Sequence, residues 1–344
     1  MNYKIAVNNI DATEKEQNIL RTLTTWLPSQ ILDIHTHFGL PEHVLFVDEE
    51  IENTSAADFL YCDYETHQVF NNLLKGIRIT QVAFSFPFKG INIVEANNYI
   101  LRLAQCHDNI IPFLTGMPEN KEGVEYTISE ILSGKYKGLK CYGQRLKDSP
   151  KNIQDFFRLE MLQAVNSMGL PIILHIPGEL NNFVQEILEL ANNYPKTKFI
   201  LAHMGRQYLF QKDYPETLEK LRQSNLNNIF LDTSFCMDSK VIKCGLEIMG
   251  YEKILYGSDQ PYNMIKGRIY KHPLKGARIM ANQKYPWVNS EEWCYYKHQI
   301  KNLVYVELEI LLAIKAALAN IKNQETIKQR LFLKNAIKVL NITL

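Results

Sequence analysis

Two hydrophobic patterns alternate along most of the chain. Between residues 65 and 257, stretches with apolar side chains at helical spacing alternate with short, continuous apolar runs, and loops that contain Gly or Pro separate them. Together with a first apolar run after the N-terminal region, the short runs predict eight strands, at residues 30–35, 80–85, 110–115, 138–141, 171–175, 198–202, 229–232 and 254–257.

The helical pattern fills the segments between these strands. The predicted helices cover residues 65–76, 93–106, 123–132, 151–168, 181–193, 214–224 and 239–249. Strands that read as continuous apolar runs are buried on both faces, which is typical of a parallel sheet covered by helices. Eight alternating units therefore predict an α/β fold, a (β/α)8 TIM barrel. The competing fold, an open doubly wound sheet, usually carries a Gly-rich phosphate turn, and the sequence contains neither GxGxxG nor GxxxxGK[ST].

Additional helices flank the predicted barrel. Residues 13–27 form a lead-in helix, in which Thr13 is the N-cap, Glu16 completes a capping box and Pro28 ends the helix. At the other end, amphipathic stretches at 291–320 and 325–340 are expected to pack on the barrel. Because no linker separates these parts, we expect a single domain over residues 1–344, made of a lead-in helix (1–29), the barrel strands (30–260) and a loop with C-terminal helices (261–344).

Composition and charge narrow the class of protein. A chain of 344 residues with 46% hydrophobic and 22% charged residues can bury a large core. The formal net charge of +1, without a Lys/Arg block, argues against a nucleic-acid partner bound through a broad basic face. The six cysteines never form CxxC, so we expect free thiols. No signal-like segment or 18-residue apolar run is found, so we expect a cytoplasmic protein without a membrane partner.

Polar residues with metal-binding side chains follow several of the predicted strands. His35 and His37 end the first strand, and residues i and i+2 of a strand project to the same face. His175 ends the fifth strand, and His203 and Asp259 follow the sixth and the eighth. In barrel enzymes the carboxyl ends of the strands hold the active site. The His35–His37 pair alone fits ordinary polar residues equally well, but four of nine histidines at strand ends favour a functional cluster.

These residue types suit a catalytic metal ion. Imidazole and carboxylate bind zinc, manganese or iron, and a catalytic site keeps one coordination position open for water. A metal lowers the pKa of that water toward about 7. An aspartate at the metal can take the water's proton, and a nearby histidine can stabilise a developing oxyanion or transfer a proton.

The same residues carry a family resemblance. The His-Thr-His strand end, Leu-His-Ile-Pro-Gly, Leu-Ala-His-Met-Gly, Leu-Tyr-Gly-Ser-Asp-Gln-Pro and the closing Leu-Phe-Leu-Lys-Asn-Ala-Ile-Lys-Val-Leu occur in this order. From about residue 31 to the end, the chain resembles the amidohydrolase superfamily, and more narrowly its amidohydrolase-2 branch, which includes relatives of aminocarboxymuconate-semialdehyde decarboxylase. The resemblance implies a barrel with a divalent metal, usually zinc. It implies ligand roles for His35, His37, His175 and Asp259, and a catalytic or supporting role for His203.

Lys140 bears on the number of metal ions. In binuclear members of the superfamily a lysine on the fourth strand is carboxylated and bridges two ions, and Lys140 follows Gly138 and Leu139 on that strand. The branch that the chain resembles typically binds one metal, so we expect one ion, with Lys140 as a cation that faces the substrate. Two ions are expected if Lys140 is carboxylated.

Three arginines and two tyrosines are candidates for substrate binding. Arg206 is the first choice and Arg145 the second for pairing with a substrate carboxylate, and Arg268 is a third candidate in the long segment 261–290. Tyr142 and Tyr262 could line the pocket.

The remaining histidines lie away from the predicted strand ends. For these we expect exposed or partly buried polar roles and no metal binding; they are His43, His67, His107, His272 and His298. The Cys141 thiol points away from the Lys140 side chain along the strand, so a nucleophile role is not expected. The long segment 40–63 follows the first strand, and loops of this length usually carry a function.

Together these features predict a metal-dependent hydrolase. A metal-activated water would attack an amide, lactone or ester carbon of a small anionic substrate, with Asp259 as general base and His203 as oxyanion or proton partner. The close alternative is a non-oxidative decarboxylase of an aromatic or dienoic acid, with Arg206 or Lys140 holding the carboxylate. A barrel that binds a small ligand without turnover is a further alternative, because fold alone does not determine function. The C-terminal helices could serve a homodimer.

Overall fold

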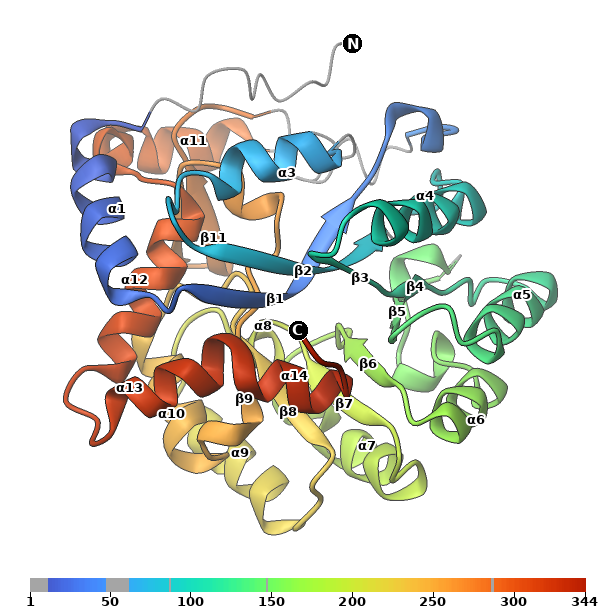
Figure 1. Ribbon diagram of the computed structural model, residues 1–344. Coiled ribbons are helices and arrows are strands. Elements are labelled where there is room, and N and C mark those ends of the chain that lie inside the picture. Colours follow the sequence, from blue (N-terminus) through green and yellow to red (C-terminus); the bar gives the residue numbers. More distant parts are fainter. Residues whose placement is uncertain (1–11, 48–61, 87, 147, 286–287) are drawn as a thin grey trace.

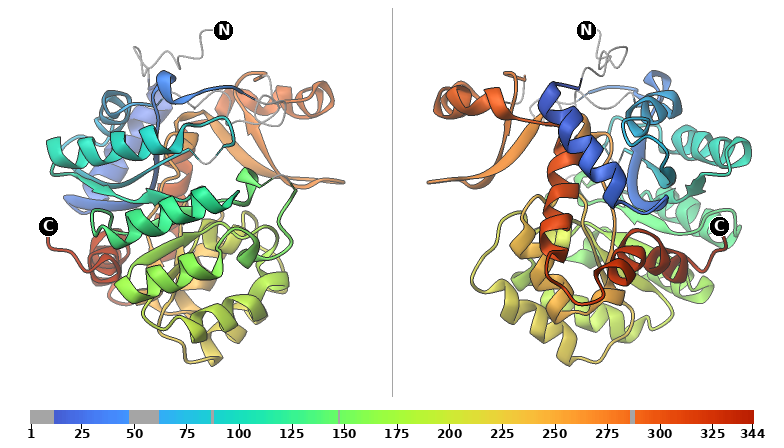
Figure 2. Two further views of the ribbon diagram at one scale, coloured as in Figure 1. Left: turned by 90° about the vertical axis from the view of Figure 1, so that its right-hand side faces the viewer. Right: turned by 60° about the vertical axis from the view of Figure 1, so that its left-hand side comes forward.

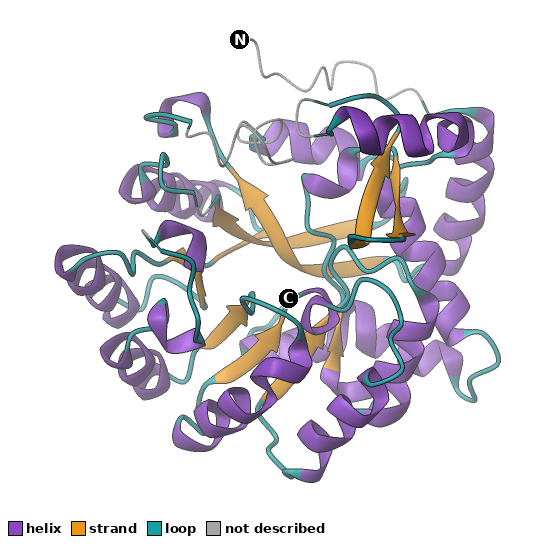
Figure 3. Cartoon of the chain, turned by 180° about the vertical axis from the view of Figure 1, so that it is seen from behind, coloured by secondary structure: helices purple, strands orange, loops and turns teal. Residues whose placement is uncertain are grey.

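The computed structural model describes residues 12–47, 62–86, 88–146, 148–285 and 288–344. Its centre is a barrel of parallel strands surrounded by helices (Figures 1 and 3). The strands of the barrel are β1 (Gln30–Phe38), β2 (Arg78–Ser85), β3 (Ile110–Pro112), β4 (Leu114–Thr115), β5 (Leu139–Cys141), β6 (Pro171–Leu174), β7 (Lys198–Leu201), β8 (Ile229–Asp232) and β9 (Ile254–Leu255).

Hydrogen bonds close these strands into a ring. Parallel pairing runs in order from β1 to β3 and from β4 to β9. β3 and β4 are one strand interrupted at Phe113, whose N–H donates to the Ala83 carbonyl of β2 at 2.9 Å. On the other side, the Ile34 N–H of β1 donates to the Tyr256 carbonyl after β9 at 3.1 Å. The (β/α)8 barrel prediction is therefore confirmed, with the predicted strand 110–115 observed in two pieces.

Seven helices beside the strands form most of the outer layer. They are α3 (Tyr64–Asn71), α4 (Ile93–Cys106), α5 (Lys121–Leu132), α6 (Leu159–Met168), α7 (Leu180–Asn193), α9 (Tyr214–Gln223) and α10 (Ser239–Ile248). The helix predicted from residue 151 is wrong in its first part, because the chain there makes a 3₁₀ turn (Ile153–Asp155). The Asp155 carboxylate accepts from the backbone N–H groups of Lys151 and Asn152 at 2.8 and 2.9 Å, and such local bonds compete with a helix.

The lead-in helix α1 (Glu14–Trp26) has the predicted capping box. The Glu16 carboxylate accepts from the Thr13 N–H at 2.8 Å, and it also accepts from the Lys266 ammonium at 2.7 Å and the Tyr305 N–H at 3.1 Å. Glu16 is completely buried. One capping residue thus fastens the start of the chain to its C-terminal part.

The C-terminal third differs most from the prediction. The predicted helix 291–320 is wrong as a single element, since α11 (Ser290–Tyr296) and α12 (Val306–Leu318) flank a 3₁₀ turn (Lys297–Asn302). The segment 261–290, expected as a loop, contains an antiparallel hairpin, β10 (Gly267–His272) and β11 (Gly276–Ala281). The hairpin and α11 project from the side of the barrel (Figure 2). They share a small core of their own, formed by Met280, Val288 and Tyr296. Of the predicted loop 40–63, residues 48–61 lie outside the described residues.

The last helices close the amino end of the barrel. α13 (Gln324–Gln329) leads through a π-helical turn (Arg330–Lys334) into α14 (Asn335–Leu340). Ala336 and Leu340 of α14 pack in one apolar cluster with the strand residues inside the barrel. The Asn335 amide donates to the carbonyl of Ile254, the first residue of β9, at 2.8 Å. Among the described residues, no helix combines the length and the apolar character that a membrane crossing requires.

Candidate metal centre

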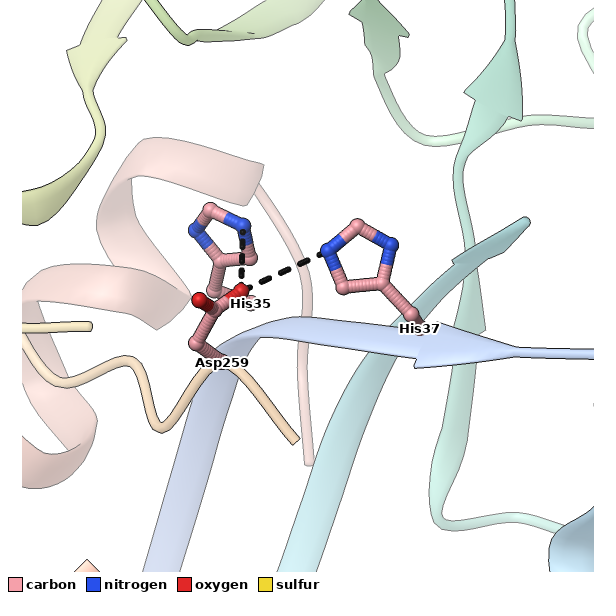
Figure 4. A group of neighbouring side chains, drawn as sticks. All are labelled: His35, His37 and Asp259. Carbon is pink, nitrogen blue, oxygen red and sulfur yellow. Dashed lines mark ion pairs between the residues drawn. The ribbon is translucent and has the colours of Figure 1, made fainter. Parts of the chain in front are cut away.

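Two histidines of β1 and one aspartate after β9 converge at the carboxyl end of the barrel. The Nε2 atoms of His35 and His37 lie 3.3 and 3.4 Å from the same carboxylate oxygen of Asp259 (Figure 4). The candidate ligand atoms of the three residues all lie within 4.8 Å of one another, and all three residues are buried. The i, i+2 spacing on β1 thus brings both imidazoles to one point, as the sequence pattern predicts.

The protonation states of this cluster favour cation binding. Burial lowers the pKa of His35 well below its usual value, and the nearby Lys140 ammonium lowers it further. Burial also lowers the pKa of His37. Burial opposes ionisation of Asp259, but the imidazoles of His203, His35 and His37 outweigh it and hold the pKa of this carboxyl below its usual value. The cluster therefore offers two imidazoles that lose their protons readily and one carboxyl group that ionises readily, and the deprotonated forms of both groups are the ones that bind metals.

Asp232, at the end of β8, holds the His35 ring at Nδ1, the nitrogen that does not face Asp259. Its carboxylate lies 3.0 Å from His35 Nδ1, and the Ser234 hydroxyl lies 3.1 Å from the same nitrogen. A hydrogen on Nδ1 leaves the Nε2 lone pair directed toward Asp259, which is the usual arrangement of a metal-binding histidine. The sequence reasoning missed Asp232. Its position in the sequence could have indicated it, because Asp232 is the last residue of the predicted strand 229–232.

The segment after β7 is a left-handed turn. All four residues of α8 (His203–Arg206) have positive φ, at 56° for His203, 54° for Met204, 74° for Gly205 and 60° for Arg206. This region costs a non-glycine residue about 1–2 kcal/mol. A Cβ on Gly205 would meet Leu180 at 2.8 Å.

Hydrogen bonds from neighbouring elements hold this turn. The His203 N–H donates to the Asp232 carboxylate at 2.9 Å. The Tyr214 hydroxyl donates to the Met204 carbonyl at 2.9 Å. Asp232 therefore contacts both the His35 ring and the backbone of the turn, and it couples the two strand ends. Asp259 also has a positive φ, 64°, so strained backbone gathers around the cluster.

His203 and His175 form a pair beside the converging cluster. His203 Nδ1 lies 3.0 Å from the Ser234 carbonyl, so this nitrogen carries the hydrogen. His203 Nε2 therefore accepts from His175 Nδ1, at 3.2 Å. His175 does not belong to the group of three described above. Burial lowers the pKa of both imidazoles.

Lys140 lies directly against the cluster. Its ammonium is 3.3 Å from His35 Nε2 and 4.6 Å from the centre of the Tyr142 ring. Burial lowers the pKa of Lys140 to about 7, although the carboxylates of Asp232 and Asp259 act in the opposite direction. The Tyr142 hydroxyl lies 3.3 Å from His37 Nε2. Both residues thus face the same space as the candidate ligands.

The three candidate arginines have different surroundings. The Arg206 guanidinium donates to the carbonyls of Ile176 and Pro177 at 3.1 and 2.7 Å, and it has no carboxylate partner among the ion pairs of the described residues. Arg145 is paired with the Glu119 carboxylate, so its charge is already matched.

Arg268 lies outside this site. It is 61% exposed and pairs with Glu309 at 3.3 Å. Of the three arginines, Arg206 is the one without a carboxylate partner among the ion pairs of the described residues, so its role in binding an anion stays a prediction.

The expectation of exposed or partly buried histidines is wrong at three positions. His43, His67 and His272 are buried, because each packs on an aromatic ring or caps local backbone. His67 also contacts the cluster, since its Nε2 lies 2.9 Å from the His37 carbonyl.

Aromatic rings surround the candidate ligands. The Phe86 ring stacks on His37 at 5.2 Å, and the Tyr262 ring lies 5.5 Å from it. The Tyr208 ring lies 5.7 Å from His203. These rings give the site planar apolar walls.

The residues present fit a catalytic metal ion. Two imidazole nitrogens and one carboxylate oxygen are a donor set that zinc, manganese and iron accept. Three converging protein ligands leave coordination positions for water or substrate, as in catalytic centres. The Asp232–His35 hydrogen bond supplies the outer support that such ligands usually have.

Comparisons with known proteins bear on the fold and the family of this chain. A sequence search of curated proteins gives no match. Among solved structures, the chain is similar to 5-carboxyvanillate decarboxylase from Sphingomonas paucimobilis, with a TM-score of 0.60 and 14% identity over 92% of this chain and 100% of that one. A manganese-bound mutant of the enzyme of the same name from Novosphingobium aromaticivorans gives a TM-score of 0.58 and 13% identity over 91% and 97%.

A third similar structure carries a different description. A probable 2-pyrone-4,6-dicarboxylic acid hydrolase from Acinetobacter baumannii, with citric acid bound, gives a TM-score of 0.56 and 14% identity over 91% of this chain and 99% of that one. At these identities the structural likeness establishes the fold alone. The model of the amidohydrolase family Amidohydro_2 matches residues 33–342 of the sequence. This chain therefore belongs to the amidohydrolase-2 family.

Proposed function

We propose that this protein is a metal-dependent hydrolase that acts on a small anionic substrate at the carboxyl end of its barrel. The observation that carries the proposal is the convergence of His35, His37 and Asp259 within 4.8 Å, in a buried site. We propose one divalent ion, zinc or manganese, held by these three residues, with His175 as a further ligand or as a partner of His203. When bound there, such an ion would supply an activated water by lowering the pKa of that water toward about 7.

The chain's own residues would carry the other steps. Asp259 is ionised and accepts a proton from the attacking water. The His203–His175 pair, linked at 3.2 Å, would take up this proton and, once protonated, would stabilise a developing oxyanion or return the proton to the leaving group. The unmatched Arg206 guanidinium binds a substrate carboxylate. Lys140 is a second cation facing the substrate, and Tyr142 lines the site beside it.

A decarboxylase of an aromatic or dienoic acid is the second candidate. The aromatic walls formed by Phe86, Tyr142 and Tyr262 favour it, because a planar unsaturated acid can stack between such rings. In this reaction Arg206 or Lys140 would hold the carboxylate, the C–C bond would break to release carbon dioxide, and the electron pair left on the carbon would take up a proton.

Substitution of Asp259 tests the catalytic centre. For a substrate found by screening lactones, amides and unsaturated carboxylic acids, we expect Asp259→Asn to lower kcat by about 10²–10⁴-fold, the usual contribution of a general base. The proposal fails if purified protein binds no divalent metal and Asp259→Asn leaves turnover unchanged. Arg222→Gln, at an exposed pair with Glu219, is a matched surface control.

Isotope labelling separates the two reactions. In water enriched in ¹⁸O, a hydrolase places the label in its product and releases no carbon dioxide. A decarboxylase releases carbon dioxide without net consumption of water, and that result would replace the hydrolase proposal with the second candidate.

A further inference from the structure

His67 lies next to the candidate metal centre but is not one of its ligands. It belongs to α3, is completely buried, and its ring stacks on Phe38 with 3.8 Å between ring centres. Its Nε2 lies 2.9 Å from the His37 carbonyl, and its Nδ1 lies 3.1 Å from the Gln81 side-chain amide nitrogen. A carbonyl can only accept, so Nε2 carries the hydrogen and Nδ1 accepts from Gln81. The orientation of the ring is thus fixed on both sides.

The His37 carbonyl needs this donor because the sheet does not supply one. The His37 N–H donates to the Gln260 carbonyl at 2.7 Å. In a parallel ladder, the carbonyl of the same residue then accepts from the N–H two positions further along, which is that of Tyr262. The Tyr262 N–H instead turns back to the Asp259 carbonyl at 2.8 Å. His67 therefore satisfies a buried carbonyl that would otherwise lack its ladder partner.

The network continues from His67 to the residue after Asp259. The Gln81 side-chain amide donates to His67 and also to the Gln260 side-chain carbonyl at 3.0 Å. Gln81 and Gln260 are both buried. The peptide groups of His37 are thus held by Gln260 at the N–H and by His67 at the carbonyl, and Gln81 joins the two.

We propose that His67 is a positioning residue that fixes His37 relative to Asp259 and so raises the affinity of the centre for a divalent metal. The inference rests on the proposed function, because it assumes that the two residues bind the same ion. Loss of outer hydrogen bonds around metal ligands typically weakens metal binding by about 10–100-fold.

A cobalt titration tests this role without a substrate. His67→Phe keeps an aromatic ring on Phe38 but removes both nitrogens, and we expect its Kd for Co²⁺ to rise by about 10–100-fold, as for loss of other outer hydrogen bonds. His67→Gln retains an N–H donor and should recover most of the affinity. His107→Phe is the matched control, since His107 stacks on Tyr64 at the same 3.8 Å but does not contact the centre.

The outcomes distinguish this role from the proposed function. A wild-type protein that binds no Co²⁺ overturns both. A wild-type protein that binds Co²⁺, with His67→Phe equal to it in Kd and in the visible Co²⁺ spectrum, overturns the role of His67 alone. If His67→Phe does not fold, His67→Met decides, because it removes both ring nitrogens and with them the donor to the His37 carbonyl. We expect the same loss of Co²⁺ affinity, and unchanged binding would overturn the role.

Discussion

The two ends of the barrel are built from the same strands but depend on different forces. At the amino end, Ala336 and Leu340 of α14 pack against apolar side chains such as Leu32, and their contribution scales with the area removed from water. At the carboxyl end, charged and polar side chains such as Lys140 and Asp232 are completely buried, and each is stable only with its partners. The amino end therefore stabilises the fold, whereas the carboxyl end holds buried reactive groups at a cost in stability.

Removal of a candidate ligand should have the largest effect: it should lower metal affinity and leave the barrel folded. His37→Ala removes an imidazole nitrogen that lies 3.4 Å from Asp259, so we expect a loss of metal affinity greater than the about 10–100-fold that outer hydrogen bonds contribute. The barrel should remain folded, because the apolar cluster at the amino end is unchanged. Calorimetric metal titration and thermal unfolding of the metal-free protein measure the two effects. A variant with wild-type affinity would remove His37 from the ligand set.

The opposite result is expected at the amino end. Leu340→Ala deletes a side chain that is 5% exposed, and such changes cost about 2–5 kcal/mol of unfolding free energy. Metal affinity of the folded protein should stay within a factor of about two, since Leu340 packs in the amino-end cluster and the candidate ligands lie at the carboxyl end. Leu344→Ala, at a residue that is 57% exposed, is the control and should be nearly neutral. Chemical denaturation measures the free energy. A loss of metal affinity in folded Leu340→Ala would contradict the separation of the two ends.

The sequence predicts features that depend on local patterns better than features that depend on contacts between residues far apart in the chain. The barrel strands and the convergence of His35, His37 and Asp259 could be predicted, because strand periodicity and parallel order place strand ends together. The Asp232–His35 contact joins residues 197 positions apart, and no local pattern encodes it.

Three other features escaped prediction. The left-handed turn at His203–Arg206 opposes the local preference of L-residues and exists because Asp232 and Tyr214 hold it. His67 looks like an ordinary helical histidine until the ladder partner of His37 is seen to be missing. The hairpin β10–β11 was missed because it packs on its own small core beside the barrel.

Substitution of Lys140 tests how its charge affects metal binding at the carboxyl end. With one metal, Lys140→Met removes a cation 3.3 Å from a candidate ligand, so we expect severalfold tighter metal binding and lower turnover. With a carboxylated Lys140 that bridges two ions, the same change should instead lower the metal content. Elemental analysis together with a metal titration distinguishes the two cases. Lys253→Met is the control, because Lys253 directly precedes β9, at the amino end, and its ammonium lies 4.7 Å from the Phe230 ring.

The smallest effect is expected at Arg268, which belongs to neither end. Its guanidinium is 61% exposed and contacts Glu309 at 3.3 Å, and exposed ion pairs of this kind contribute about 0–1 kcal/mol. Arg268→Ala should therefore leave unfolding free energy, metal affinity and turnover almost unchanged. Arg145→Met should lower the unfolding free energy more than Arg268→Ala does. Arg145 is 7% exposed, and its loss leaves the Glu119 carboxylate and the Phe88 carbonyl without their donor. A marked loss of turnover in Arg268→Ala, with stability unchanged, would mean that the projecting hairpin reaches the substrate and that the functional end of the barrel extends beyond the strand ends.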